Sequence, residues 1–224
     1  MQRLTLFDLD HTLLDGDSDV LWCEFLMDRG VLDRGEFAAR NLAMERDYRA
    51  GTVTTQAFSE FYVATLAGRS PADWEPLRQE FLHERITPRL SDAAHALVRH
   101  HHERDDLTVL STATNRYLCE LSAAHLGFEH LIATECEFDA DGRFSGRTAG
   151  TLNMRDGKVV RLHEWLAGRG CRLADFDSSF YSDSLNDLPL LCAVTQPVAV
   201  NPDPRLALEA QRRGWTVLAL PPTA

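Results

Sequence analysis

The sequence lacks a long hydrophobic run, a paired cysteine motif and any surplus of basic residues. No apolar stretch among its 224 residues approaches the roughly 18 residues that suggest a transmembrane helix, so we expect no membrane association. The five cysteines are odd in number and scattered without a C-x-x-C pair, which indicates neither a disulfide framework nor a zinc site. The N-terminus shows no signal-peptide pattern, and we expect a cytoplasmic protein.

Negatively charged residues outnumber positively charged ones in this chain. The formal net charge is -11, which disfavours binding to a nucleic-acid backbone and leaves no basic stripe for it. Such a surface also repels a phosphorylated metabolite, so a site for one needs its own local positive charge. Hydrophobic residues make up 44% of the chain and charged residues 25%, a balance typical of a globular protein with a sizeable core.

Hydrophobic spacing changes along the chain. Residues 4–7 form a short apolar run typical of a buried strand, and residues 18–84 follow helical three-four spacing with breaks near Gly30, Gly51 and residues 68–71. After Pro88 the chain alternates between predicted helices and strands, with a hairpin over residues 135–146. The helices are predicted at 92–103, 115–126, 158–167 and 186–192, and the strands at 107–110, 131–133, 176–182, 198–200 and 216–218.

This alternation predicts an α/β fold, a doubly wound parallel sheet. The helical block after the first strand is then a cap inserted over the carboxyl edge of the sheet. We expect a catalytic core of residues 1–15 and 88–224 and a helical cap of residues 16–87.

Two carboxylates follow the first predicted strand. Asp8 and Asp10 leave the strand end on the same side, because side chains alternate along a strand. Open α/β sheets bind ligands at this edge, and two carboxylates so close favour a divalent cation between them.

Three more polar signals occur where a predicted strand meets a helix or where a helix begins. Residues 111–115, STATN, place hydroxyls and backbone N–H groups at a helix start, which suits an anion. Lys158 lies near a helix N-terminus, where a cation opposes the helix dipole and so indicates a role beyond helix stability. Asp183 and Asp187 add two carboxylates after a later strand.

In this order the four motifs resemble those of the haloacid dehalogenase superfamily of phosphatases. The likeness is greatest to the subgroup with a helical cap after the first motif, subfamily IB, which includes phosphoserine phosphatases. Residues 112–116, TATNR, and 199–203, AVNPD, are similar to stretches of bacterial hydrolases, some of them histidinol-phosphate phosphatases.

The resemblance implies a mechanism. Asp8 is the nucleophile that forms an aspartyl-phosphate, and Asp10 protonates the leaving alcohol and then activates water. Lys158 and Thr112 hold the phosphoryl oxygens. The carboxylates of Asp8 and Asp183, with Asp10 through its backbone carbonyl, bind Mg²⁺.

Further positions are assigned through the same resemblance. Asp187 orients Lys158 or the metal-bound waters. The candidate substrate-binding residues are Thr12, which also fixes the loop of the aspartates, Asn186 and Asp17. Either Ser111 or Thr112 could be the second-motif hydroxyl, and aligning the following helix and its Leu126-Gly127 end with phosphoserine phosphatases favours Thr112.

The resemblance implies that the substrate is a small phosphomonoester. Two features of the sequence indicate which phosphomonoester it is. Asp17 falls where phosphoserine phosphatases carry an acid that meets the substrate amino group, although it could equally cap a helix. Residues 61–66 lack the arginine that grips the carboxylate of serine in that family, although Arg46, Arg49 or Arg69 could substitute. These features favour an amino-alcohol phosphate such as histidinol phosphate over phosphoserine. A phosphoserine phosphatase or a phosphotransferase is an alternative, and a haloacid dehalogenase or a non-catalytic binding module is less favoured.

Overall fold

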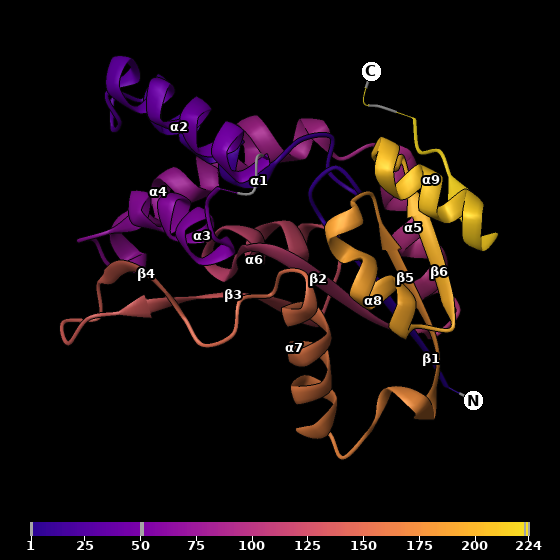
Figure 1. Cartoon of the computed structure of the whole chain (residues 1–224). Coiled ribbons are helices and arrows are strands. Elements are labelled where there is room, and N and C mark those ends of the chain that lie inside the picture. Colours follow the sequence, from indigo (N-terminus) through magenta and orange to yellow (C-terminus); the bar gives the residue numbers. More distant parts are fainter. Residues whose placement is uncertain (1, 50–51, 222, 224) are drawn as a thin grey trace.

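A seven-stranded sheet forms the centre of the computed structural model, which describes residues 2–49, 52–221 and 223 (Figure 1). The strand order is β4-β3-β2-β1-β5-β6-β7, and every neighbouring pair is parallel except β3 with β4. The strands are β1 (Gln2–Phe7), β2 (Leu107–Asn115), β3 (Leu131–Phe138), β4 (Phe144–Ala149), β5 (Phe176–Ser182), β6 (Gln196–Val200) and β7 (Thr216–Leu218).

The predicted α/β parallel sheet is confirmed, and the predicted hairpin is β3 with β4. The sequence prediction was wrong about β2, which was expected to end at Leu110 and instead continues through Asn115. Polar residues extend this strand because β2 pairs with β3 as far as Asn115 and Thr134, across a shift in register.

Helices cover both faces of the sheet. Side chains alternate along β1, so Leu4 and Leu6 join the core under α7, α8 and α9, whereas Phe7 joins the core on the face of α5 and α6. These helices are α5 (Asp92–His102), α6 (Arg116–His125), α7 (Asp156–Ala167), α8 (Leu188–Ala193) and α9 (Pro204–Arg213).

Four helices lie between β1 and α5 in sequence. They are α1 (Ser18–Asp28), α2 (Arg34–Arg49), α3 (Thr55–Val63) and α4 (Pro71–Phe81), and short helical turns follow α3 and α4. They lie together beyond the carboxyl end of β1 and against the β3–β4 hairpin (Figure 1). The backbone of Phe144 on β4 pairs with this segment, donating to Arg69 O at 3.0 Å and accepting from Gly68 N at 2.9 Å.

The predicted helical block after the first strand is therefore present. The division into a core of residues 1–15 and 88–224 and a cap of residues 16–87 stays a prediction. In the parts of the chain that the structure describes, no helix has the length and hydrophobicity that crossing a bilayer requires.

Candidate active site

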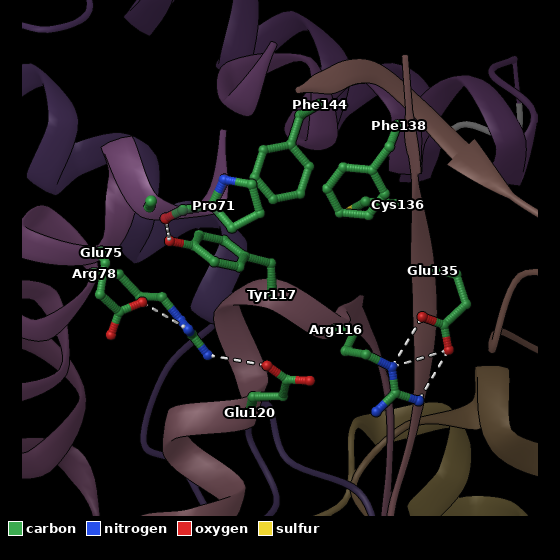
Figure 2. Close-up of a pocket in the computed structure, with 11 residues that line it drawn as sticks. Pro71, Glu75, Arg78, Arg116, Tyr117, Glu120, Glu135, Cys136, Phe138 and Phe144 are labelled. Atoms are coloured by element: carbon green, nitrogen blue, oxygen red, sulfur yellow. Dashed lines mark hydrogen bonds and ion pairs between the residues drawn. The ribbon is translucent and has the colours of Figure 1, made fainter. Parts of the chain in front are cut away.

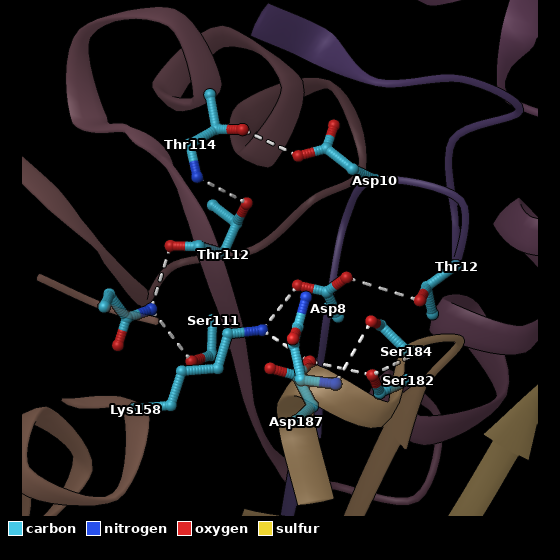
Figure 3. A network of polar contacts seen from close by, with 12 residues as sticks. Asp8, Asp10, Thr12, Ser111, Thr112, Thr114, Lys158, Ser182, Ser184 and Asp187 are labelled. Carbon is cyan, nitrogen blue, oxygen red and sulfur yellow. Dashed lines mark hydrogen bonds and ion pairs between the residues drawn. The ribbon is translucent and has the colours of Figure 1, made fainter. Parts of the chain in front are cut away.

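The polar motifs meet at one edge of the sheet because β1 lies between β2 and β5. Asp8 and Asp10 follow β1, and Asp183 and Asp187 follow β5. Lys158 reaches the same place from the first turn of α7. Figure 3 shows the resulting network, in which Lys158 and Asp10 lie on opposite sides of Asp8.

Lys158 is buried between two carboxylates. Its Nζ donates hydrogen bonds of 2.7 Å to Asp8 Oδ1 and 2.7 Å to Asp187 Oδ2, and Asp187 also accepts from Ser182 Oγ at 2.7 Å. Burial alone would lower the pKa of Lys158, but Asp187 and Asp8 outweigh it and hold that pKa above its ordinary value. Lys158, the only lysine in the sequence, is therefore a fixed positive charge in an acidic site.

Asp8 and Asp183 carry more negative charge than Lys158 offsets. Burial raises the pKa of Asp8 to about 7 against the opposing effect of Lys158, and Asp187 and Asp10 add to the rise. Burial and then the charge of Asp8 raise the pKa of Asp183 to about 8. These shifts mark a place where a further cation would stabilise the ionised carboxylates.

Thr12 joins the two acidic loops. Its Oγ1 lies 3.4 Å from Asp8 Oδ2 and 3.2 Å from Asp183 Oδ1, and it accepts a hydrogen bond of 3.1 Å from Asp183 N. The predicted role of Thr12 in fixing the loop of the aspartates fits these contacts.

Asp10 is held on both carboxylate oxygens. Its Oδ1 accepts from the backbone N–H of Ser18 at 2.8 Å and from the Ser18 hydroxyl, and its Oδ2 accepts from Thr114 Oγ1 at 2.6 Å. The Ser18 contacts come from the start of α1 and the Thr114 contact from β2. The carboxylate is thus oriented by both the helical segment and the sheet.

Ser111 and Thr112 lie on β2, just beyond Leu110, which pairs with Phe7. Thr112 Oγ1 accepts from Thr114 N at 3.2 Å, whereas Ser111 Oγ accepts from Asn153 Nδ2 at 3.1 Å. The two hydroxyls have different partners, and the choice of Thr112 as the second-motif hydroxyl stays a prediction.

Asn153 is a buried amide that the sequence analysis missed. Its Nδ2 donates to Ser111 Oγ, to Thr112 O at 2.9 Å and to Ile132 O at 2.9 Å, while its Oδ1 is buried without a partner. It therefore joins the loop before α7 to β2 and β3. No spacing signal marks it in the sequence, because its partners lie 21 to 42 residues away.

The loop before α7 also depends on Gly157. A Cβ at this position would collide with the carbonyl oxygen of Leu152, so only glycine lets the loop fold back tightly as α7 begins. This close approach lies directly between Asn153 and Lys158 along the chain, and it helps to place both.

Two predicted substrate-binding residues make no hydrogen bond to Asp8, Lys158 or Asp187 among the described contacts. Asn186 is exposed, and its backbone N–H donates to Ser184 Oγ at 3.2 Å. Asp17 caps α1 by accepting from Val20 N at 3.0 Å, which agrees with the capping alternative, and its role toward substrate stays a prediction. Burial and then the charge of Asp10 raise the pKa of Asp17 to about 6, so the carboxylates of Asp17 and Asp10 lie near each other.

Arginines outside residues 61–66 could bind a substrate carboxylate instead, but the two whose side chains are described have other partners. Arg46 pairs with Asp47 on the surface, and Arg69 lies over the Trp74 ring at 4.4 Å. The side chain of Arg49 lies outside the described part of the structure.

The donor set suits Mg²⁺. The carboxylates of Asp8 and Asp183 both approach Thr12 Oγ1 and supply hard oxygen ligands, and their raised pKa values signal uncompensated charge. Within the described residues, no group of three Asp, Glu, His or Cys side chains is arranged to hold a metal. A backbone carbonyl, such as that of Asp10, and water would therefore have to complete the shell.

A separate pocket of about 340 Å³ lies between α4, α6 and the β3–β4 hairpin (Figure 2). Its charged groups are paired with one another: Arg78 with Glu75 and Glu120, and Arg116 with Glu135. None of the predicted site residues lines it.

Comparisons with known proteins show which family this chain resembles. The profile of the haloacid dehalogenase-like hydrolase family matches residues 5–191. A histidinol-phosphatase of Neisseria meningitidis serogroup C is 40% identical over 219 residues, which cover 97% of this chain and 99% of the relative.

Solved structures share the fold. A protein of unknown function from Bordetella pertussis Tohama I superposes with a TM-score of 0.94 at 46% identity, covering 97% of this chain and 98% of the other. A substrate-bound phosphoserine phosphatase superposes with a TM-score of 0.69 at 16% identity, covering 97% of this chain and 93% of the other, a likeness of fold alone.

Proposed function

The chain belongs to the haloacid dehalogenase-like hydrolase family and is a phosphatase of that family, and on this basis we propose that it hydrolyses a small phosphomonoester through an aspartyl-phosphate, with Mg²⁺. The arrangement that supports this most directly is Asp8 hydrogen-bonded to Lys158, with Asp10, two residues on, held by hydroxyls on both oxygens. A nucleophile, a fixed cation and an oriented proton carrier are the groups that transfer of a phosphoryl group to a carboxylate requires.

In the first step Asp8 attacks phosphorus in line with the leaving alcohol. Lys158 offsets charge on the phosphoryl oxygens, and the hydroxyl of Thr112 donates to one of them. Asp10 gives its proton to the leaving oxygen, so the alcohol departs neutral. Bound Mg²⁺ would neutralise charge shared by Asp8, Asp183 and the phosphoryl group.

In the second step Asp10, now ionised, takes a proton from water, and that water attacks the phosphorus of the aspartyl-phosphate. Asp8 leaves as a carboxylate and inorganic phosphate is released. Ser18 and Thr114 keep Asp10 aimed at the same position in both steps, because they hold both of its oxygens. Asp187 keeps Lys158 in place throughout.

The substrate we propose is an amino-alcohol phosphate, with histidinol phosphate as the first candidate. The 40% identical relative named as a histidinol-phosphatase supports it, as does the acidic group at Asp17. Residues 61–66 contain no arginine that could pair with a carboxylate of the substrate. This disfavours phosphoserine as the substrate. Thr12 and Asn186 remain proposed contacts on the substrate side.

A panel of phosphomonoesters tests the proposal. Histidinol phosphate, phosphoserine and p-nitrophenyl phosphate would be assayed for phosphate release with Mg²⁺, first alone and then with a competing alcohol to detect transfer. We expect hydrolysis, with histidinol phosphate preferred, and no turnover by a folded Asp8→Asn variant, because an amide is a poor nucleophile. Normal turnover by that variant would contradict the assignment.

A further inference from the structure

The first turn of α1 carries a second acid that the mechanism does not use. Asp19 is half-buried and lies two residues beyond Asp17, on the helix whose first residue holds Asp10. Its Oδ1 accepts from Asn115 Nδ2 at 3.3 Å. Asn115 also caps α6 by accepting from Leu118 N at 3.1 Å, so it fixes Asp19 relative to the sheet.

Neighbouring residues of β2 hold Asp10 and Asp19. Thr114 donates to Asp10 and Asn115 donates to Asp19, which places the second acid beside the proton carrier. Lys158 and Asp10 lie on opposite sides of Asp8, to which Lys158 donates a hydrogen bond (Figure 3). The two ends of the site therefore differ in charge. A fixed cation lies at the end for the phosphate, and carboxylates lie at the end where the alcohol leaves.

Cations offset these carboxylates only in part. His11 lowers the pKa of Asp17, against the larger effects of burial and of Asp10, which raise it. Across the described residues, Asp10, Asp17 and Asp19 form no ion pair with lysine or arginine. After burial, the charges of Asp17 and Asp10 are the largest influences that raise the pKa of Asp19, and only Asn115 opposes them. Partly desolvated carboxylates without a partner are costly, and a cationic group of the substrate would offset that cost.

Two acids could share one ammonium, which has three N–H donors, or could each take a separate basic group. Asp17 uses one oxygen to cap α1, which leaves the other for a single ammonium, whereas Asp19 uses one oxygen for Asn115. The relative named as a histidinol-phosphatase points to the phosphate ester of an alcohol that bears both an amine and an imidazole. Two separate acids beside Asp10 fit such an alcohol, with one acid for each basic nitrogen group.

We propose that Asp19 is a specificity-determining residue that binds a second basic nitrogen of the substrate, an imidazole or a group of similar charge. This inference rests on the proposed phosphatase function and narrows its substrate to alcohols with two basic groups. Asn115 is a positioning residue, because it acts on the substrate only through Asp19.

Three substrates and matched variants test it. The substrates are histidinol phosphate with an amine and an imidazole, phosphoethanolamine with an amine alone, and p-nitrophenyl phosphate with neither. The variants are Asp19→Asn, Asp17→Asn and, as a control, Glu24→Gln, which removes an exposed acid from the same helix. Asp19→Asn keeps an oxygen that can accept from Asn115, and thermal unfolding checks each fold.

We expect Asp19→Asn to lower kcat/KM for histidinol phosphate by about ten- to a hundredfold, the range for a lost charge-assisted hydrogen bond. The same variant should leave the other two substrates nearly unchanged. Asp17→Asn should lower kcat/KM for both amines, and Glu24→Gln should change none. Asp19→Glu, which keeps the charge, should recover part of the loss, and it replaces Asp19→Asn as the test if the latter fails to fold.

Two results would overturn the inference while leaving the proposed function intact. One is an equal loss on all three substrates, which would make Asp19 structural. The other is no loss on histidinol phosphate. A wild-type protein that releases phosphate from none of the three substrates would instead contradict the proposed function.

Discussion

Lys158 donates a 2.7 Å hydrogen bond to Asp8, which lies 150 residues earlier in the chain. It is the only lysine in the sequence, and it is buried between two acids. A helix start is an unfavourable place for a cation, since the helix dipole is positive there. The contacts with Asp8 and Asp187 supply the compensating energy, and they place the charge where a phosphoryl group would bind.

We predict that Lys158→Met lowers kcat/KM by about a hundred- to a thousandfold on every substrate, the cost of removing one preorganised donor to a developing charge. Arg161→Met, one turn later on α7 and paired with Glu135, is the matched control and should retain activity. Steady-state kinetics on p-nitrophenyl phosphate measures both. A Lys158→Met enzyme as active as the control would remove Lys158 from the mechanism.

The single lysine also permits a direct test of its charge. Because Asp187 and Asp8 hold the pKa of Lys158 above its ordinary value, the lysine should stay protonated past pH ~10.4, where a free side chain is half titrated. NMR of the protein labelled at lysine Cε gives one side-chain resonance to follow with pH. Titration below pH ~10 would show that the two carboxylates do not hold the proton as described.

Mg²⁺ should be required, and its effect on stability should depend on pH. Without metal the pKa values of Asp8 and Asp183 are raised to about 7 and about 8, so their contribution to stability is complete below the ordinary value of 3.8 and is lost as the pH rises through the raised values. The Tm of the metal-free protein should fall between pH 5 and pH 8.5.

Added Mg²⁺ binds the ionised carboxylates, so it should raise Tm more at pH 8.5 than at pH 5. Asp183→Asn should flatten both the decline in Tm and the Mg²⁺ effect, and EDTA should abolish turnover of the wild type. Full activity after exhaustive chelation, or a Mg²⁺ effect on Tm that is larger at pH 5, would contradict this account.

Asn153 should matter for both stability and rate. Asn153→Ala removes three hydrogen bonds and leaves buried oxygens of Ser111, Thr112 and Ile132 without their donor, which should cost roughly 2–4 kcal/mol in unfolding free energy. Because two of those bonds hold the second motif, kcat should also fall.

Asn41→Ala is the control, since Asn41 accepts from Tyr62 OH in the helical segment away from the site. It should lower stability without lowering kcat. Denaturant unfolding and kinetics at a temperature where both variants are folded separate the two effects. An Asn153→Ala enzyme with wild-type kcat would limit Asn153 to a structural role.

The periodicity of hydrophobic residues was enough to predict the strands and helices of the sheet. The order of the four polar motifs along the chain was enough to suggest the family. Asp8 and Asp183 could be located because each comes directly after an apolar strand, and parallel strands bring their carboxyl ends to one edge. Lys158 stood out because it opposed the local helix dipole. Each of these signals depends on neighbouring residues in the chain, so it can be recognised from a single sequence.

Other features depend on contacts between distant segments. The extension of β2 through Ser111 and Thr112 arises from pairing with β3, which overrides a polar stretch typical of a loop. No apolar spacing marks Asn153. No motif marks Asp19, because its partner Asn115 lies 96 residues away in the chain. Such residues become visible only when the partners are placed in space.

The central claim is that Asp8 carries the phosphoryl group, and trapping that species tests it most directly. Asp10→Asn can still accept a phosphoryl group from a good leaving group, but it lacks the base for the second step. This variant would be mixed with p-nitrophenyl phosphate and Mg²⁺, quenched in acid within its first turnover, digested and examined by mass spectrometry. We predict one added phosphoryl group on the peptide that contains Asp8, labile to hydroxylamine and absent from the Asp8→Asn, Asp10→Asn double variant. Release of p-nitrophenol with no covalent phosphate on that peptide, or phosphate attached at another residue, would contradict the account.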